Sequence, residues 1–232
     1  MNSFHGCINN MEKEELQSAI HKAKTGSHKK NFKQTVDLII NLRGLDLKKP
    51  DHQVDSFITL PHSKGKKVKV CALVGPEMME QAKTTCDSAI SLDDFEKFKD
   101  KKQVKKLASG YDYFIAQANI MAKIATVFGR VLGPRGKMPN PKSGCVVPPN
   151  ANLKPLYEKL QKTVRINSKT APLIQCAIGS EEMKEADIVE NGMTVYKSLL
   201  QALPNERHNV KDIYIKLTMG TPVKIGETEE KK

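Results

Sequence analysis

Alternating apolar and polar side chains mark two segments that lie far apart in the chain. The first covers residues 36–42, with the sequence VDLIINL, and the second covers residues 213–219. Such alternation predicts strands with one face buried and the other open to water. Three more strands are expected at residues 54–60, 163–169 and 172–180. The terminal parts of the chain are therefore expected to form a half-covered sheet.

Helical spacing of apolar residues predicts two helices beside these strands. In residues 12–24 acids come early and lysines late, as the two ends of a helix prefer. A second helix is predicted from Asp187, its expected N-cap, to about Leu203, despite the Asn191-Gly192 pair inside it. Together with the half-covered strands, these helices indicate an α+β domain made from both ends of the chain.

The central part of the chain follows a different pattern. Residues 68–74 and 111–117 are almost continuously apolar, which is typical of strands covered on both faces. The helical segments predicted between and after them are residues 77–83, 91–108 and 118–132. This alternation of strand and helix indicates a small α/β layer domain.

Two breaks in composition flank this central block. Residues 62–67 are polar and basic, and residues 146–155 are rich in Pro and Asn, so both are interpreted as linkers. We assign residues 11–64 and 159–232 to an outer α+β domain, residues 65–158 to an inserted α/β domain and residues 1–10 to a flexible extension. The alternative is three small units in a row, and it is less favourable because each would be too small to hold a core.

The amino-acid composition limits the classes of binding partner that the protein can have. Lys and Arg number 38 against 26 Asp and Glu, so the net charge is +12, which favours a polyanion or an anionic membrane surface. No apolar run approaches the ~20 residues that span a bilayer, and the first ten residues lack a secretory pattern, so no membrane contact is expected. The five cysteines form no CxxC and the six histidines no ligand pair, so no disulfide, metal or cofactor is expected.

A glycine-rich stretch at residues 127–145 is the most distinctive passage. Its glycines Gly129, Gly133, Gly136 and Gly144 are interspersed with Arg130, Arg135, Lys137 and Lys142. Glycines let backbone N–H groups approach phosphate, and the cations supply charge. It is not a P-loop, because Val131 and Met138 stand where that motif needs Gly and Ser or Thr. From Tyr113 to Tyr157 there is no acid, so a polyanion-facing surface is favoured over an ordinary solvated turn.

Two further segments could contact nucleic acid. A basic stretch before the first strand holds Lys22, Lys24, Lys29, Lys30 and Lys33. Phe32 lies among them and could stack on a base or ribose, although it could equally plug the core at the strand entrance. In residues 216–220, KLTMG, Gly220 would allow close approach of RNA and Thr218 offers a hydroxyl, while an ordinary strand end is the alternative. No catalytic set such as GxSxG or HExxH is present.

Four passages together resemble the family of the universal large-subunit ribosomal protein numbered one, in its archaeal-type form. They are residues 30–42 (KNFKQTVDLIINL), 128–141 (FGRVLGPRGKMPNP), 148–155 (PPNANLKP) and 216–220 (KLTMG), and their order and spacing also match. The likeness runs from about Met11 to Ile225. Residues 1–10 extend beyond it, residues 142–147 look like a small insertion, and Thr221 stands where the family often has Pro.

The resemblance implies an RNA-binding α+β domain with an antiparallel sheet, interrupted by a Rossmann-like α/β domain of three layers. It implies a structural protein of the cytoplasmic ribosome, not an enzyme, that binds the rRNA stalk of the large subunit near the tRNA exit site. There it would assist the release of deacylated tRNA. Relatives also repress translation of their own mRNA, so that mRNA leader is another expected partner. Off the ribosome the protein is expected to be a monomer.

In this family the main rRNA contact belongs to the domain built from both termini. The RNA-binding residues that this implies here are Lys30, Phe32, Lys33, Thr35, Lys169, Lys216, Thr218, Met219 and Gly220. A secondary surface is expected at the glycine-rich stretch, with Arg130, Gly133, Arg135, Gly136, Lys137 and Lys142. Two alternatives stay open: a nucleotide-dependent enzyme that uses the α/β domain, and a translational repressor whose main target is mRNA.

Overall fold

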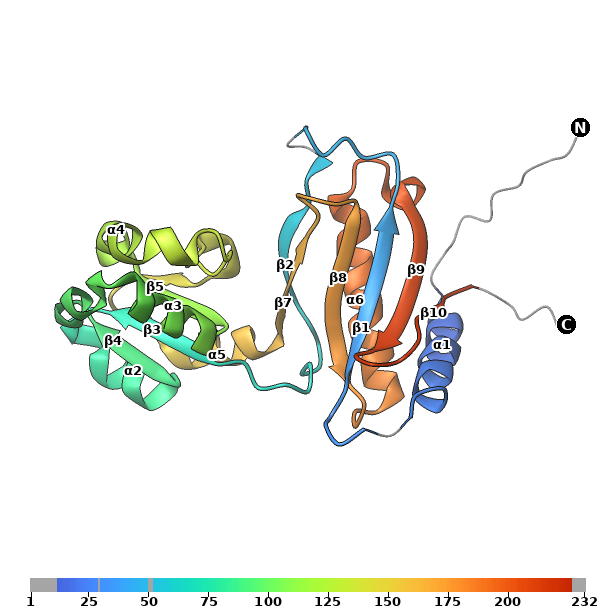
Figure 1. Ribbon diagram of the computed structural model, residues 1–232, viewed down its shortest axis with the longest axis horizontal. Helices are drawn as coiled ribbons and strands as arrows, with labels where there is room; N and C mark the ends of the chain where they lie inside the picture. Colours follow the sequence, from blue (N-terminus) through green and yellow to red (C-terminus); the bar gives the residue numbers. More distant parts are fainter. Residues whose placement is uncertain (1–11, 29, 50–51, 227–232) are drawn as a thin grey trace, which may run out of the picture. The chain divides into compact units, whose positions relative to one another are not determined.

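The computed structural model describes residues 12–28, 30–49 and 52–226, which divide into two compact units (Figure 1). The terminal unit combines the chain up to Lys66 with the chain from Lys162 onward, and the inserted unit runs from Lys67 to Gln161. The expected boundaries, after residues 64 and 158, lie slightly earlier. The expected extension at residues 1–10 lies outside the described residues.

A four-stranded antiparallel sheet of order β10-β9-β1-β8 is the framework of the terminal unit. Its strands are β1 (Thr35–Leu42), β8 (Leu173–Ser180), β9 (Val210–Leu217) and β10 (Val223–Lys224), and a separate antiparallel pair joins β2 (Asp55–Thr59) to β7 (Thr163–Asn167). Both alternating segments are strands, as predicted, and they pair with Val36 opposite Leu217. The second strand ends at Leu217, not at residue 219, because the Gly220 N–H donates to the Leu217 carbonyl at 2.9 Å and turns the chain.

Helices α1 (Lys13–Thr25) and α6 (Glu185–Ala202) share one core with the buried side of this sheet (Figure 1). The alternate residues of β1, beginning with Val36 and Leu38, point into that core. The expected N-cap at Asp187 is wrong. The Ile188 N–H donates to the carbonyl of Lys184, which is the cap, so Asp187 already lies in the first turn.

The Asn191-Gly192 pair inside α6 has a packing role. An added Cβ at Gly192 would come within 3.1 Å of the Leu16 Cδ2 on α1. Asn191 is fully buried: its Nδ2 donates to the Ile178 carbonyl at 2.8 Å, and its Oδ1 accepts from the His62 N–H at 3.0 Å. The ~1 kcal/mol that a glycine costs within a helix is therefore offset by close helix packing.

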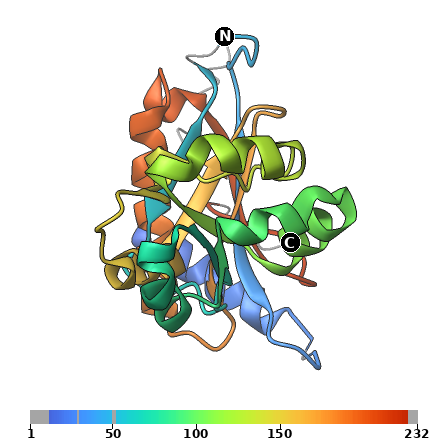
Figure 2. The same ribbon diagram turned by 90° about the vertical axis from the view of Figure 1, so that its left-hand side faces the viewer.

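The inserted unit is a three-layer α/β fold around a parallel sheet of order β4-β3-β5-β6. The strands are β3 (Val70–Val74), β4 (Ser88–Ser91), β5 (Tyr113–Gln117) and β6 (Val146–Val147). One core lies between the sheet and helices α3 (Lys101–Gly110) and α4 (Met121–Leu132), and a second lies between the sheet and α2 (Met79–Thr85) and α5 (Leu153–Lys162) (Figures 1 and 2). Every residue of β3 is buried. The predicted fold class is confirmed.

Some local predictions for this unit are wrong. Residues 146–155 are not a linker, because β6 and the start of α5 lie within them, and both Val147 and Leu153 are buried. The helix expected over 91–108 is broken at Asp100, whose carboxylate accepts from the Lys102 N–H at 3.0 Å and so caps α3. Strand β4 has only four residues, SAIS, which are too short and polar to give a signal.

Short 3-10 turns complete the described chain. They span Pro76–Met78, Asp93–Lys99, Ala118–Ile120, Pro141–Ser143 and Glu206–Asn209. None of the helices within the described residues combines the length and the apolar composition that crossing a bilayer requires.

Candidate nucleic-acid interface

The buried side chain of Gln34 joins three segments of the terminal unit just before β1. Its Nε2 donates to the Ser27 Oγ at 3.1 Å, and its Oε1 accepts from the Met219 N–H at 3.2 Å. Its backbone carbonyl accepts from the Glu181 N–H at 2.9 Å. Because a buried amide needs its hydrogen bonds, Gln34 fixes the turn after β9 against the loop before β1.

Thr35 and Thr218 are in direct contact beside Gln34. Their Oγ1 atoms are 2.9 Å apart, and the Thr35 N–H donates to the Thr218 Oγ1 at 3.1 Å. The Thr218 N–H in turn donates to the Thr35 carbonyl at 3.1 Å. The Thr218 hydroxyl therefore already has hydrogen-bond partners inside the protein. RNA can bond only to the donor and acceptor sites of the Thr35 and Thr218 hydroxyls that remain unused.

Two large apolar side chains stand exposed on the segments that Gln34 joins. Phe32 is 51% exposed and Met219 is 65% exposed. The reading of Phe32 as a core plug is therefore wrong. An open hollow of about 390 Å³ lies beside it, lined by Lys30, Asn31, Phe32, Lys33, Glu181 and Glu182. An exposed aromatic ring next to a hollow and two cations can stack on an unpaired base.

The lysines expected at this surface differ in their surroundings. Lys30 is exposed on the rim of the hollow. The Lys33 Nζ lies 2.8 Å from the Glu182 Oε2 in an exposed ion pair. Lys169 follows β7 in the chain, and its Nζ lies 2.7 Å from the Oδ2 of Asp55 on β2. Hydrogen bonds from Arg165 and then Lys169 outweigh burial and lower the pKa of Asp55.

Lys216 and Gly220 complete the set predicted for the terminal unit. Lys216 is half-buried on β9 opposite Asp37, whose pKa is raised by burial and partly lowered again by the Lys216 charge. A Cβ added at Gly220 would lie 3.2 Å from the Leu217 Cβ, tighter than most real contacts. Gly220 thus has a packing reason of its own. The structure brings Thr35, Thr218, Met219 and Gly220 together, and exposed Phe32 lies on the loop that leads into Thr35; we call these five residues the terminal cluster.

The glycine-rich stretch of the inserted unit is fastened to α3 by its cations. The Lys137 Nζ donates to the carbonyls of Ala108 and Tyr111, at 2.9 and 2.7 Å. The Arg135 Nη1 donates to the Ser109 Oγ at 2.9 Å and the Lys105 carbonyl at 3.3 Å. Positive charge at a helix C-terminus satisfies its last carbonyls. These two residues, predicted to contact RNA, therefore have a structural function that sequence alone does not show.

The other predicted members of this stretch surround that attachment. Arg130, Gly133, Gly136 and Lys142 are exposed. A Cβ at Gly133 would come within 2.7 Å of the Gly129 carbonyl oxygen, and Gly136 has a φ of +65°. Both positions therefore require glycine to let α4 end and the chain turn back, whatever ligand is present.

The crevice where an open parallel sheet normally binds a ligand is closed by a side chain. Such sites lie beyond the carboxyl ends of the strands where the strand order reverses, here between β3 and β5. The buried Gln117 occupies this place, and its Oε1 accepts from the Gly75 N–H at 2.8 Å. A nucleotide phosphate would have to displace that bond, so the structure disfavours the nucleotide-dependent alternative.

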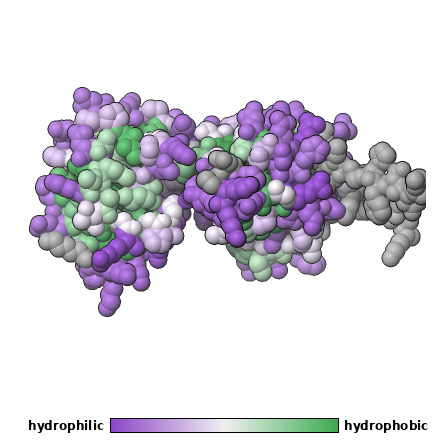
Figure 3. Space-filling model, turned by 90° about the horizontal axis from the view of Figure 1, so that it is seen from above, coloured by the Kyte–Doolittle hydropathy of each residue, from purple (hydrophilic) through white to green (hydrophobic). Residues whose placement is uncertain are grey.

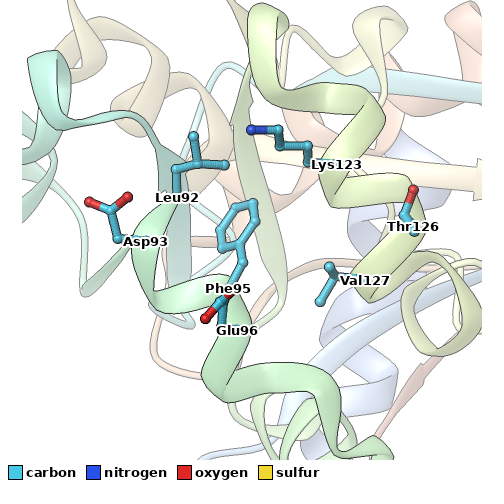
Figure 4. Close-up of a pocket in the computed structure, with 7 residues that line it drawn as sticks. All are labelled: Leu92, Asp93, Phe95, Glu96, Lys123, Thr126 and Val127. Atoms are coloured by element: carbon cyan, nitrogen blue, oxygen red, sulfur yellow. The ribbon is translucent and has the colours of Figure 1, made fainter.

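A hollow of about 570 Å³ lies between the Asp93–Lys99 turn and α4 on the inserted unit (Figure 4). The Phe95 ring and Val127 form its apolar floor, while Asp93 and Glu96 stand on one wall and Lys123 on the other. Carboxylates on the rim repel phosphate. Apolar residues also gather on the face of this unit that carries α4 (Figure 3). Within the described residues no group of histidine, cysteine, aspartate and glutamate side chains could hold a metal ion.

Sequence reasoning missed the two buried glutamines, Gln34 and Gln117. Gln34 is in phase with Val36 and Leu38, which the same alternation assigns to the buried face. A polar residue at such a position must find hydrogen bonds inside the protein, so the signal was present. Gln117 ends a continuous apolar strand, and its partner across the crevice could not be seen from its own segment.

The protein is basic, it carries an exposed cluster held by hydrogen bonds, and its ligand crevice is closed. These features are typical of a nucleic-acid-binding protein. Residues 20–221 match the family described as the ribosomal protein L1p/L10e family. The chain is 38% identical over 216 residues to the large ribosomal subunit protein uL1 of Methanothermococcus thermolithotrophicus, covering 93% of this chain and 99% of that protein. It is 40% identical to the protein of the same name from Methanobrevibacter smithii, covering 91% and 99%.

A third relative of the same name, from Thermococcus kodakarensis, is 39% identical over 92% of this chain and 98% of its own length. The chain belongs to the ribosomal protein L1p/L10e family. It is a structural protein of the cytoplasmic ribosome and not an enzyme, as the resemblance implied.

Proposed function

We propose that this protein is a constituent of the large ribosomal subunit that binds the rRNA of a stalk near the tRNA exit site. The observation that carries the proposal is the terminal cluster, where Gln34 and the Thr35–Thr218 contact fix exposed Met219 against the loop that carries exposed Phe32. Relatives over nearly their whole length are named as large-subunit proteins.

The terminal cluster and the surrounding lysines would have different roles in binding. Phe32 and Met219 can cover unstacked bases, and the Thr35 and Thr218 hydroxyls can bond to a ribose 2′-OH, which distinguishes RNA from DNA. Lys30 and Lys33 would contact phosphates and release counterions. Shape and hydrogen bonding would thus provide specificity, while the lysines provide affinity.

We further propose that the bound protein assists release of deacylated tRNA from the exit site and represses translation of its own mRNA. The second role needs only that the mRNA leader presents the same unpaired bases to the terminal cluster. A leader fragment and a stalk-rRNA fragment should then compete for one site, with the rRNA binding more tightly. If the leader binds more tightly, mRNA is the main target instead.

The test of the primary site compares two truncations of exposed apolar side chains on the same unit. Phe32→Ala should weaken binding of a stalk-rRNA fragment by about tenfold or more, since base–aromatic stacking is worth ~1–3 kcal/mol. Leu173→Ala is the matched control, because Leu173 is also exposed, at 36%, but begins β8. Equal affinities of the two variants would refute this site. ATP and GTP should bind neither variant nor the parent protein.

A further inference from the structure

Helix α3 carries four exposed lysines on one face. They are Lys101, Lys102, Lys105 and Lys106. None of them takes part in an ion pair within the described part of the chain. Lys101 and Lys105, and likewise Lys102 and Lys106, stand at the i,i+4 spacing at which like charges repel. The helix sequence KKQVKKLASG contains no acid to offset this repulsion.

Arg135 extends this lysine face. Its guanidinium bonds to Ser109 and to the Lys105 carbonyl, so it lies against the C-terminal half of α3 while staying exposed. We call Lys101, Lys102, Lys105, Lys106 and Arg135 the α3 face. Val104 and Ala108 of the same helix point into the core. The five cations therefore stand on a surface whose position is fixed by packing beneath it.

The chain from the start of α3 to residue 157 has almost no negative charge of its own, whereas the preceding turn carries Asp93, Asp94 and Glu96. Between Lys101 and Tyr157 the sequence contains ten lysines and arginines and a single acid, Asp112. The Asp112 Oδ2 accepts from the Lys69 N–H at 3.3 Å. Asp100 lies at the N-terminal end of α3, where its carboxylate caps the helix. Surfaces that merely face water usually mix the two signs, whereas an unbroken field of one sign fits a polyanion.

We propose that the α3 face is a second RNA-binding surface, which holds the phosphate backbone of an RNA double helix irrespective of its sequence. Lysines at regular helical spacing suit the repeated charges of a nucleic-acid backbone better than the scattered acids of a protein. All five members of the α3 face are cations, so it recognises charge and shape, while the half-buried Phe98 and Tyr111 line a hollow beside Lys106. The inference goes beyond the proposed function, which assigns rRNA to the terminal cluster.

The experiment compares two double variants of the full chain that lose the same charge from the same unit. Lys105→Gln with Lys106→Gln changes the α3 face. Lys83→Gln with Lys154→Gln is the control, since these exposed lysines lie on α2 and α5, which pack on the opposite side of the sheet. The probe is a labelled RNA duplex of about 20 base pairs with an arbitrary sequence, titrated at several salt concentrations.

The α3 variant should bind the duplex about tenfold more weakly at 0.1 M salt, and the slope of log affinity against log salt should fall by about 1.8 for two lost phosphate contacts. Its melting temperature should equal or slightly exceed that of the parent, because two repulsive pairs, Lys101–Lys105 and Lys102–Lys106, have been relieved. The control should keep the parent's affinity and slope.

Two results would overturn the proposal. The first is an unchanged duplex affinity in the α3 variant, which would leave an acidic protein as the better partner. The second is an equal loss in both variants, which would reduce the effect to net charge. The Phe32→Ala measurement on the stalk fragment is separate, so failure of the proposed function would leave this comparison intact.

Discussion

Gln34→Leu tests whether one buried hydrogen-bonding side chain positions the terminal cluster. Leucine keeps most of the volume but leaves the Ser27 Oγ and the Met219 N–H without their partner. Two neutral hydrogen bonds are worth ~2 kcal/mol together, with water replacing part of the loss because Met219 is exposed. For a protein of this size the melting temperature of the terminal unit should fall by about 4–8 °C.

RNA binding should fall by about tenfold in the same variant, because Met219 loses the bond that fixes it against the loop before β1. The slope of affinity against salt should not change, since no cation is removed. The control is Gln53→Leu, which removes a side-chain bond to the Leu47 carbonyl at 2.8 Å elsewhere in the terminal unit. Calorimetry and a fluorescence titration with stalk rRNA measure both effects. If both glutamine variants lose affinity equally, or neither does, Gln34 has no positioning role.

Three further predictions concern the same unit. Thr218→Ala removes the acceptor of the Thr35 N–H and should cost ~1 kcal/mol of unfolding free energy, measured by urea titration, with weaker RNA binding at an unchanged salt slope. Glu182→Gln releases Lys33 from its ion pair and should strengthen RNA binding in a titration without changing stability by more than ~0.5 kcal/mol. Because the folded pKa of Asp55 is lowered, its ionised form stabilises the protein above the unfolded pKa, and this is lost as pH falls through the folded pKa. Asp55→Asn should therefore destabilise at neutral pH, and its difference from the parent in urea titrations should vanish in acid.

The spacing of apolar residues and the changes in composition were sufficient to predict the main strands and the insertion of one domain into another. β1 and β9 follow from alternation because burial acts on alternate residues there, and β3 follows from an unbroken apolar run because every one of its residues is buried. β6 was not predicted, because two residues are too few to show an alternation of apolar and polar side chains and the prolines after it resemble a linker. Its place in the sheet depends on pairing with β5, which is a contact between distant segments.

The sequence predicted which residues belong to the candidate site, but it did not predict the hydrogen bonds that they form. Residue types and the family resemblance led to Phe32, Thr218 and Met219, but only the β1–β9 register places Thr218 beside Thr35. The same limit applies to Lys137, whose sequence neighbours say nothing of the α3 carbonyls it satisfies. Local sequence indicates which side chains could act, whereas the packing of distant segments decides which ones already have a partner.

Whether a lysine already has a carboxylate partner changes how much it can add to RNA affinity, so the number of lysines alone does not predict that affinity. Lys33 and Lys169 face carboxylates at 2.8 and 2.7 Å, so RNA must exchange an existing ion pair for a phosphate contact. The exposed Lys33–Glu182 pair is worth ~0–1 kcal/mol, so its exchange costs little free energy, whereas Asp55, the partner of Lys169, is mostly buried and also bonds Arg165. However, the lysine gains less from the new contact than an unpaired one would. Among the described residues the lysines of α3 have no such partner, so each phosphate they meet adds its full counterion release. The strongest salt dependence should therefore come from the inserted unit, even though the specific contacts lie in the terminal unit.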